Sequence, residues 1–246
     1  MVLRLISLGL LIAAWWLASH LAGERLLPGP PAVALAIVAE ARSGALAFNL
    51  GVTLARVAAS FVIAMALGTA FGLLMGRRPA ADRLGDPWLV ALLNLPALVI
   101  IVLAYIWAGL TESAAIAAVA LNKLPIATVT VREGARSLDP GLDDMARVFR
   151  MPTWVRLRHV VLPQLAPYLA AAARSGLSLV WKIVLIVELL GRPNGVGFEI
   201  GTAFQLFDTP RLLAYSLTFA AVVLVIETAL VQPFEARATR WRPRAA

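Results

Sequence analysis

The sequence contains no cysteine and only two histidines, His20 and His159, in 246 residues. Without cysteine the chain can form neither disulfides nor thiolate metal sites. The two histidines are isolated, with no H-E-x-x-H spacing, and no G-x-x-x-x-G-K-[ST] phosphate-binding loop occurs. We therefore expect a chain that binds no metal and no cofactor of its own.

Charge is also scarce. Charged residues make up 15% of the chain and hydrophobic residues 61%, whereas soluble domains carry about 25% charged residues. The net charge is +8, but almost every basic residue lies in a short connection between apolar runs, which is typical of membrane proteins and not of nucleic-acid-binding proteins. The composition predicts an all-α, polytopic membrane protein that is solvated by lipid and has no nucleic-acid partner.

Apolar runs of about 20 residues are long enough to cross a bilayer as helices. Six such runs predict six transmembrane helices in one domain covering residues 1–246, at 5–22, 57–76, 87–110, 113–131, 162–190 and 212–231. An even number places both termini on the same side. The first run follows Arg4 and could be a cleaved signal peptide, but its length and His20 near its end favour a retained membrane anchor.

The distribution of arginine sets the expected orientation. Fourteen arginines fall on the side of the termini, namely Arg4, Arg77, Arg78, Arg83, Arg132, Arg136, Arg147, Arg150, Arg156, Arg158, Arg237, Arg240, Arg242 and Arg244. Four fall on the other side: Arg25, Arg42, Arg192 and Arg211. Because basic residues concentrate in cytoplasmic loops, we expect both termini and the segment at about 133–161 to be cytoplasmic.

Small residues recur at every fourth position of the second run, at Ala64, Gly68, Gly72 and Gly76. On a helix they share one face and let a neighbouring backbone approach closely, so we interpret them as a helix-packing surface. Residues 191–210 contain Gly195, Gly197 and Gly201 and too few apolar residues to cross. They predict an outward-side turn and a short helix, which is either a gate or an ordinary connector.

The longest polar segment, DDMARVFRMPTWVRLRHVVLP at 143–163, reads as two short helices. Asp139 and Pro140 form a start signal, and two aspartates then fall in the first turn, where the helix dipole favours carboxylates. Pro152 ends the first helix, and Thr153 can cap a second. Met145, Val148 and Phe149 lie on one face at helical spacing. The segment therefore predicts a compact knob with an apolar face.

The same segment carries a spaced motif. Asp144-Met145-Ala146 is followed by three residues, Arg150, nine residues, and Val160-Val161-Leu162-Pro163. This resembles the E-A-A, x3, G, x9, I-x-L-P motif of the inner-membrane permease subunits of bacterial ABC importers. The pieces TLARVAASFVIAMALGTAFGLLMG, AYIWAGLTESAA and VELLGRPNGVGFEI resemble the branch that imports nitrate, sulfonates and taurine. The likeness runs from about Leu26 to the C-terminus.

The resemblance implies a type I importer fold in the bacterial inner membrane and a chain that is not itself an enzyme. It implies two copies of an ATPase subunit that uses ATP, an extracellular or periplasmic solute-binding protein and a second permease copy, expected to be identical. The solute would be a small anion or a related precursor. The residues expected to couple to the ATPase are Asp143, Asp144, Met145, Ala146, Phe149, Arg150, Leu162 and Pro163.

Three positions depart from the motif: Asp144 replaces its Glu, Met145 its first Ala, and Arg150 its Gly. Asp keeps the charge with a shorter reach, and Met keeps an apolar contact while adding bulk. The third change is the most consequential. If the Gly adopts a positive φ, Arg150 would be strained in that conformation.

Ionisable residues inside the predicted spans are candidates for the substrate path, because charges at membrane depth are costly and usually face a cavity or one another. Lys123, Lys182 and Glu188 are of this kind, and Trp181 and Asn94 could line the same path. The alternative is that the cations Lys123, Arg174 and Lys182 neutralise Glu188 or Glu227 and stabilise packing.

Two other functions fit a polytopic membrane protein but agree less well with this sequence. An ion-gradient-driven secondary transporter often has paired repeats with broken helices at matching positions, and the sequence shows neither. A membrane enzyme needs a cluster of catalytic groups at one membrane face, and none stands out. An ATP-driven importer subunit remains the preferred interpretation.

Overall fold

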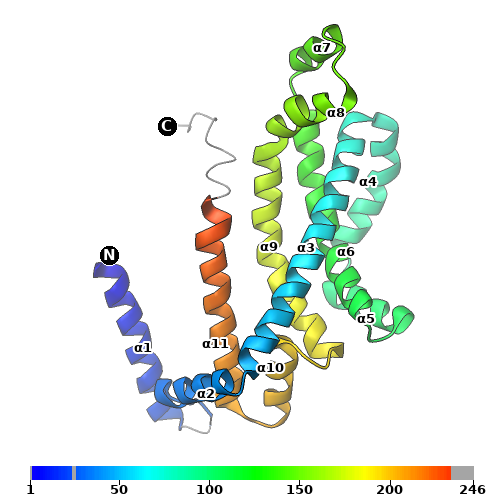
Figure 1. Cartoon of the computed structure of the whole chain (residues 1–246). Helices are drawn as coiled ribbons and strands as arrows, with labels where there is room; N and C mark the ends of the chain where they lie inside the picture. Colours follow the sequence, from blue (N-terminus) through cyan, green and yellow to red (C-terminus); the bar gives the residue numbers. More distant parts are fainter. Residues whose placement is uncertain (1, 24–25, 234–246) are drawn as a thin grey trace. The chain divides into compact units, whose positions relative to one another are not determined.

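The computed structural model describes residues 2–23 and 26–233, and these residues form helices and connecting turns with no strand (Figure 1). The helices are α1 (Val2–Ala22), α2 (Pro30–Arg42), α3 (Ala45–Arg77), α4 (Pro79–Asn94), α5 (Ala97–Ala108), α6 (Glu112–Arg136), α7 (Pro140–Val148), α8 (Thr153–Arg156), α9 (Leu162–Gly191), α10 (Val196–Gln205) and α11 (Thr209–Ile226). Two π-helical turns, η1 (Leu157–Val161) and η2 (Glu227–Val231), continue α8 into α9 and extend α11. The all-α prediction is confirmed. Arg25, Arg237, Arg240, Arg242 and Arg244, which entered the orientation argument, lie outside the described residues.

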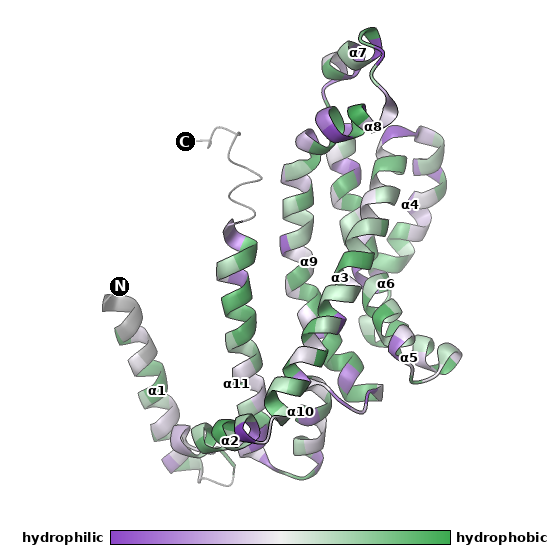
Figure 2. Cartoon of the chain, viewed as in Figure 1, coloured by the Kyte–Doolittle hydropathy of each residue, from purple (hydrophilic) through white to green (hydrophobic). Residues whose placement is uncertain are grey.

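Four of these helices are long and apolar enough to cross a membrane: α3, α6, the continuous helix Thr153–Gly191, and α11 with η2. Most residues of these helices are hydrophobic, whereas hydrophilic residues are frequent in α7 and α8 (Figure 2). In α1 the apolar part, Gly9–Ala22, is shorter. The runs predicted at 57–76, 113–131, 162–190 and 212–231 each lie within one of the four long helices.

The run predicted as one span at 87–110 is instead two helices. α4 and α5 meet at an angle of 99°. Leu95 between them is extended, with φ −75° and ψ 127°, and Pro96 precedes the first residue of α5. Proline disfavours a helical conformation in the residue before it and has no N–H to donate. The prediction of one continuous helix there was wrong, and the pair forms a fifth crossing only as a broken span.

The chain divides into two compact units. Unit 1 comprises residues 1–55 and 185–224, and unit 2 comprises residues 56–184 and 225–246. Each unit is described below by itself.

In unit 2, α3 and α6 pack with their backbones in close contact. A β-carbon at Gly68 would lie 2.6 Å from that of Ala127, one at Gly72 would lie 2.7 Å from the carbonyl oxygen of Thr128, and one at Gly76 would lie 2.5 Å from the β-carbon of Ala135. Because these distances leave no room for a side chain, only glycine permits this approach. The packing interpretation of the small residues is confirmed.

In unit 1, side chains of α1 bind the turn that leads into α2. The indole nitrogen of Trp15 donates to the Pro28 carbonyl at 3.1 Å, and the Ser19 hydroxyl donates to the Leu27 carbonyl at 2.8 Å. α2 then begins at Pro30, whose fixed φ suits the first helical position. These bonds satisfy carbonyl groups that the turn leaves outside any helix.

Candidate functional site

The segment between α6 and α9, residues 137–161, is called the α6–α9 connector here. Its first helix, α7, begins as predicted: Asp139 is the N-cap and its carboxylate accepts a hydrogen bond from the Gly141 amide at 2.8 Å. The second part differs from the prediction. Pro152, not Thr153, precedes the next helix, and no side chain caps it. That helix does not end within the connector but runs through η1 into α9.

The end of α7 is closed by two backbone hydrogen bonds. The amide of Arg150 donates to the Arg147 carbonyl at 2.9 Å, and the amide of Met151 donates to the Ala146 carbonyl at 2.9 Å. This is the Schellman arrangement, which requires a left-handed residue after the C-cap. Arg150 occupies it with φ 48°. Arg150, at the motif's glycine position, therefore has a positive φ, the conformation in which a residue other than glycine is expected to be strained.

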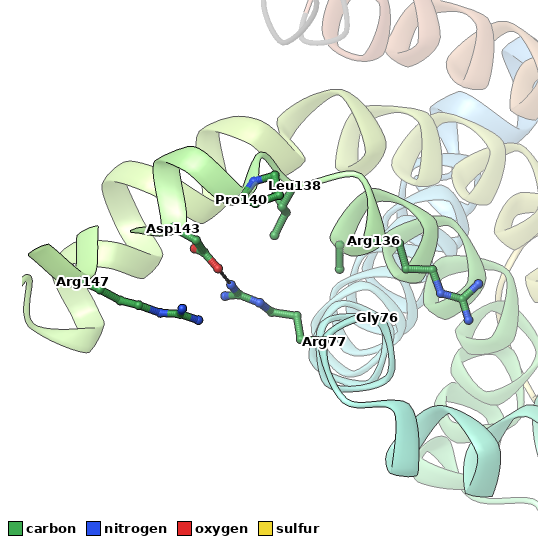
Figure 3. A pocket seen from close by; sticks show the side chains of 8 residues that line it. Gly76, Arg77, Arg136, Leu138, Pro140, Asp143 and Arg147 are labelled. Carbon is green, nitrogen blue, oxygen red and sulfur yellow. Dashed lines mark hydrogen bonds and ion pairs between the residues drawn. The ribbon is translucent and has the colours of Figure 1, made fainter. Parts of the chain in front are cut away.

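Asp143 joins this connector to the end of α3. Its carboxylate accepts hydrogen bonds from the guanidinium groups of Arg77 and Arg156, the latter at 2.8 Å. Figure 3 shows Arg77 and Asp143 pointing toward each other across an open cavity of about 400 Å³ that Arg136 and Arg147 also line. Burial raises the pKa of the Asp143 carboxyl, but the hydrogen bonds from Arg156 and Arg77 outweigh it and hold the pKa below its ordinary value. Asp143 is therefore ionised near neutral pH.

Three large apolar side chains of the connector are exposed. Val148 is 78% exposed, Phe149 71% and Trp154 64%. Around them lie charged groups, including Asp144 and Arg147, whose carboxylate and guanidinium are 3.3 Å apart. Of the other expected coupling residues, Ala146 is buried, Met145 and Leu162 are half-buried, and Pro163 is exposed. Large apolar side chains that are exposed beside charged groups are typical of a surface that binds a protein partner.

A second polar site lies in unit 1, around the segment between α9 and α11, residues 192–208, called the α9–α11 connector here. Glu188 is fully buried. Its carboxylate accepts hydrogen bonds from the Thr53 hydroxyl at 2.9 Å and from the Gly197 amide at 2.9 Å. The Thr53 oxygen in turn accepts from the Val196 amide at 2.8 Å. A β-carbon at Gly195, where φ is 107°, would lie 2.4 Å from this carboxylate. Glu188 thus organises the start of α10.

The buried polar groups extend from this centre to α2 and α11. Asn49 accepts from the Gly195 amide at 2.8 Å and donates to Glu199 at 3.0 Å. Arg211 pairs with Glu199 at 2.8 Å and with Glu40 at 3.2 Å, and the Tyr215 hydroxyl donates to Glu40 at 2.8 Å. Among the residues that the structure describes, no three side chains are placed to hold a metal ion.

Sequence reasoning missed most of this network, although one signal was present. Asn49, Thr53, Arg56 and Ser60 are buried polar residues of α3 that recur every three or four positions in an apolar helix. Such spacing marks one polar face. Its continuation in unit 2 is Arg56, whose guanidinium forms two hydrogen bonds with the Glu112 carboxylate, at 2.6 and 3.0 Å. Asn49, Thr53 and Arg56 lie before the span predicted at 57–76, whereas Ser60 lies within it. The polar face that they share was therefore not recognised from the sequence.

The residues predicted for a substrate path occupy different environments. Lys123 is fully buried in unit 2, where its amine donates to the Ala172 carbonyl of α9 at 3.0 Å and its side chain fills the space left by Gly176. Lys182 is exposed on the same helix. Trp181 is buried, and Asn94, at the end of α4, is exposed with its amide bound to the Val90 carbonyl. Glu188 belongs to the buried centre of unit 1. The role of all five in a path stays a prediction.

Residues 68–232 match the family of binding-protein-dependent transport system inner membrane components. This match includes most of the membrane helices and both connectors. The chain belongs to this family. The permease is also similar to curated relatives over nearly its whole length. It is 30% identical to a probable ABC transporter permease protein of Brucella abortus (strain 2308), over 99% of this chain and 96% of that protein.

Two relatives of Escherichia coli (strain K12) have named solutes. A permease protein assigned to the transport of aliphatic sulfonates is 30% identical, over 95% of this permease and 89% of its own length. The permease protein of a taurine transport system is 24% identical, over 96% and 88% of the two chains. Both are described as transport permease proteins, which agrees with the family.

Solved structures show that the fold is that of ABC transporter permeases. A chain of an amino acid ABC transporter superposes with a TM-score of 0.60 at 21% identity, covering 80% of the permease and 95% of that chain. A chain of the MetNI methionine ABC transporter in an inward facing conformation gives a TM-score of 0.60 at 22% identity, covering 78% and 93%. The predicted type I importer fold is therefore confirmed.

Proposed function

We propose that this permease is the transmembrane subunit of an ATP-driven importer, and that its α6–α9 connector docks on a separate ATPase subunit. The observation that carries the proposal is the exposure of three large apolar side chains in this connector, Val148 and Phe149 at the end of α7 and Trp154 in α8. Burial of these side chains against a partner would be favourable, because it removes apolar surface from water. ATP would be bound by that partner, and the permease itself would carry out no chemistry.

The link from the connector to the spans also supports the proposal. Asp143 binds Arg77 at the end of α3, and the helix that begins at Thr153 continues without a break into α9. A force applied to α7 would therefore reach two long helices through an ion pair and one continuous backbone. We propose that ATPase closure moves these helices and so alternates access to a central path between two permease copies.

The solute is proposed to be a small organic anion delivered by a solute-binding protein. The family name refers to binding-protein-dependent transport, and relatives at 24 to 30% identity are named for taurine and aliphatic sulfonates. A cytoplasmic location of the α6–α9 connector and of both termini is also proposed, and the concentration of arginines on that side of the predicted spans supports it.

Orientation can be tested with single cysteines, because the natural chain has none. Arg147→Cys lies in the α6–α9 connector and Phe207→Cys in the α9–α11 connector, at positions 68% and 88% exposed. We expect an impermeant thiol reagent to label Phe207→Cys in spheroplasts and Arg147→Cys only after the membrane is opened. Labelling of Arg147→Cys from outside would rule out docking on a cytoplasmic ATPase.

Docking is tested by co-purifying the tagged permease with a co-expressed ATPase subunit of an importer from the same genome. We expect Phe149→Asp to release the ATPase, because it places a charge in the apolar contact, while Leu206→Asp, at an equally exposed position of the α9–α11 connector, retains it. Transport by the purified permease without any ATPase would instead favour an ion-gradient-driven transporter.

A further inference from the structure

The exposed residues of α9 within unit 2 are unlike those of a lipid-facing helix. Between residues 164 and 184 the exposed positions are Ala171, Arg174, Ser175, Ser178 and Lys182. Ala171, Ser175, Ser178 and Lys182 are three or four residues apart and Arg174 adjoins Ser175, so the five lie on one face. No large apolar side chain is exposed on this stretch. We call these five positions the α9 polar face.

Another helix of the same unit shows what a lipid-facing surface of this protein looks like. Between residues 61 and 74 of α3 the exposed positions are Val62, Ile63, Ala66, Leu67, Ala70, Phe71 and Leu74, all of them apolar. The chain thus places apolar residues where a span is exposed, and α9 is the exception. A lysine or arginine exposed to hydrocarbon costs several kcal/mol by insertion scales.

Lys182 lies deep in the predicted span, where an exposed charge differs most from the exposed apolar residues of α3. Lys182 precedes the end of α9 at Gly191 by nine residues, which is about 14 Å along the helix. Ser178 and Ser175 lie one and two turns deeper. A lysine can reach toward the membrane surface with its long side chain, but this does not explain the serines or the absence of apolar neighbours on the face.

The charge of this face is positive. Arg174 is 3.7 Å from Glu227 of η2, so its charge is largely balanced. Lys182 forms no ion pair or hydrogen bond with the residues that the structure describes. Lys123 does not contribute, because it is buried on the opposite side of α9 against Ala172 and Gly176. The face therefore presents one uncompensated ammonium group beside two hydroxyl-bearing residues.

We propose that the α9 polar face lines the water-filled path of the permease and that Lys182 attracts a small organic anion, such as a sulfonate or carboxylate, into it. This rests on the proposed function and specifies its substrate-facing wall. In a symmetric pair of copies, the two faces would place two lysines along one path. Lys182 then selects by charge. The hydroxyls of Ser175 and Ser178 donate to the Ala172 and Arg174 carbonyls of their own helix, each at 3.3 Å, and would turn from these carbonyls to donate to the anion's oxygens.

Cysteines introduced into the complete importer test the proposal, since a thiol reacts as a thiolate and needs water. We would measure the reaction rates of Ser178→Cys and Ser175→Cys with two methanethiosulfonates of similar size, one bearing a sulfonate and one a trimethylammonium group. Val62→Cys, exposed on the apolar face of α3, is the matched control. We expect both serine positions to react well above this control and to favour the sulfonate reagent.

Adding Lys182→Gln to Ser178→Cys should reduce the sulfonate preference about tenfold, as expected for a unit charge roughly 6 Å away in a water-like medium. Adding Lys182→Arg should retain it. Rates at both serine positions no higher than at Val62→Cys would overturn the proposal, as would equal rates with the two reagents. ATPase co-purification is scored on the same preparations, so loss of the ATPase would count against the proposed function whatever the thiol rates are.

Discussion

The two connectors that carry the polar chemistry of this permease are built on the same plan and held by different means. In each connector the first helix, α7 or α10, ends in a Schellman turn with a non-glycine residue at positive φ, Arg150 at 48° in one and Phe207 at 56° in the other. Each is anchored by a carboxylate. Asp143 is partly exposed and bound by two arginines, whereas Glu188 is fully buried and bound by a hydroxyl and a backbone amide.

The difference indicates how firmly each connector is fixed. Exposed ion pairs contribute at most about 1 kcal/mol each, because water already solvates the separated charges. A buried carboxylate that satisfies several donors is much harder to replace, because those donors lose their only partner. The α6–α9 connector can therefore adjust to a docking partner, while the α9–α11 connector keeps its shape.

The largest effect is expected from Glu188→Ala. This change leaves the Gly197 amide buried without its acceptor and the Thr53 hydroxyl with only the Asn49 carbonyl of its own helix, and we expect the free energy of unfolding to fall by about 3 kcal/mol. Thermal unfolding of the permease in detergent micelles would measure it. Leu189→Ala, at an exposed neighbouring position, is the control and should change little. A Glu188→Ala protein as stable as this control would show that the carboxylate does not fix the connector.

Thr53→Val tests the same centre with less disturbance. Valine has nearly the shape of threonine but cannot accept the hydrogen bond of the Val196 amide, so we expect a loss of about 1–2 kcal/mol. Thr130→Val serves as the matched control, because the Thr130 hydroxyl only donates to the Ile126 carbonyl of its own helix. Equal unfolding temperatures for the two variants would contradict the assigned role of Thr53.

Asp143→Asn should cost no more than about 1 kcal/mol, but it should change the pH dependence of the α6–α9 connector. Since the pKa of Asp143 is lowered by Arg156 and Arg77, its stabilising effect is present above the ordinary pKa of 3.8 and is lost as the pH falls through the lower folded value. Hydrogen exchange of α7 should accelerate over that acidic range in the natural protein and not in the variant. The control is Asp144→Asn, which affects only an exposed pair within α7. The same acceleration in both variants would exclude Asp143 as the anchor.

The smallest effect is expected at Arg150 and Phe207, the two residues with positive φ. There we expect the free energy of unfolding to rise, not to fall. A positive φ costs residues other than glycine about 1–2 kcal/mol, and Arg150→Gly removes this cost. Glycine also increases the conformational entropy of the unfolded chain, which opposes the gain. We therefore expect a net stabilisation of about 0.5–1 kcal/mol. Phe207→Gly should behave alike in the other connector, and Arg150→Ala should give no gain. Limited proteolysis after Phe149 would report the change. Faster cleavage of Arg150→Gly would show that the arginine side chain holds the turn.

Local features of the fold were predictable from the sequence. Asp139 and Pro140 begin α7 as expected, and the small residues of α3 pack on α6, because capping and helix-face spacing depend on residues a few positions apart. The bend at Leu95 and Pro96 was missed although the proline was visible, since the apolar run continued through it and hydropathy alone does not report a break. The positive φ of Arg150 was considered only as the conformation that the motif's glycine would adopt, and the arginine itself gives no signal for it.

The candidate sites were harder to predict, because their partners are distant in sequence. Thr53 and Glu188 are 135 positions apart, and Arg77 and Asp143 are 66 apart. A single sequence shows that Glu188 is an acid inside an apolar run, but it does not show which donors reach it. Lys123 illustrates the same limit: its partner is a backbone carbonyl of α9, which no side-chain pattern reveals.

The three glycines of α3 have a mechanical consequence. Helices that touch through ordinary side chains can slide as those side chains change rotamer, but here the backbones of α3 and α6 meet at three successive turns. Tyr168 of α9 lies equally close to Gly134 of α6. A displacement imposed on α3 at this end of unit 2 would therefore be transmitted directly to α6, whereas α9 meets α6 through a side chain that can change rotamer.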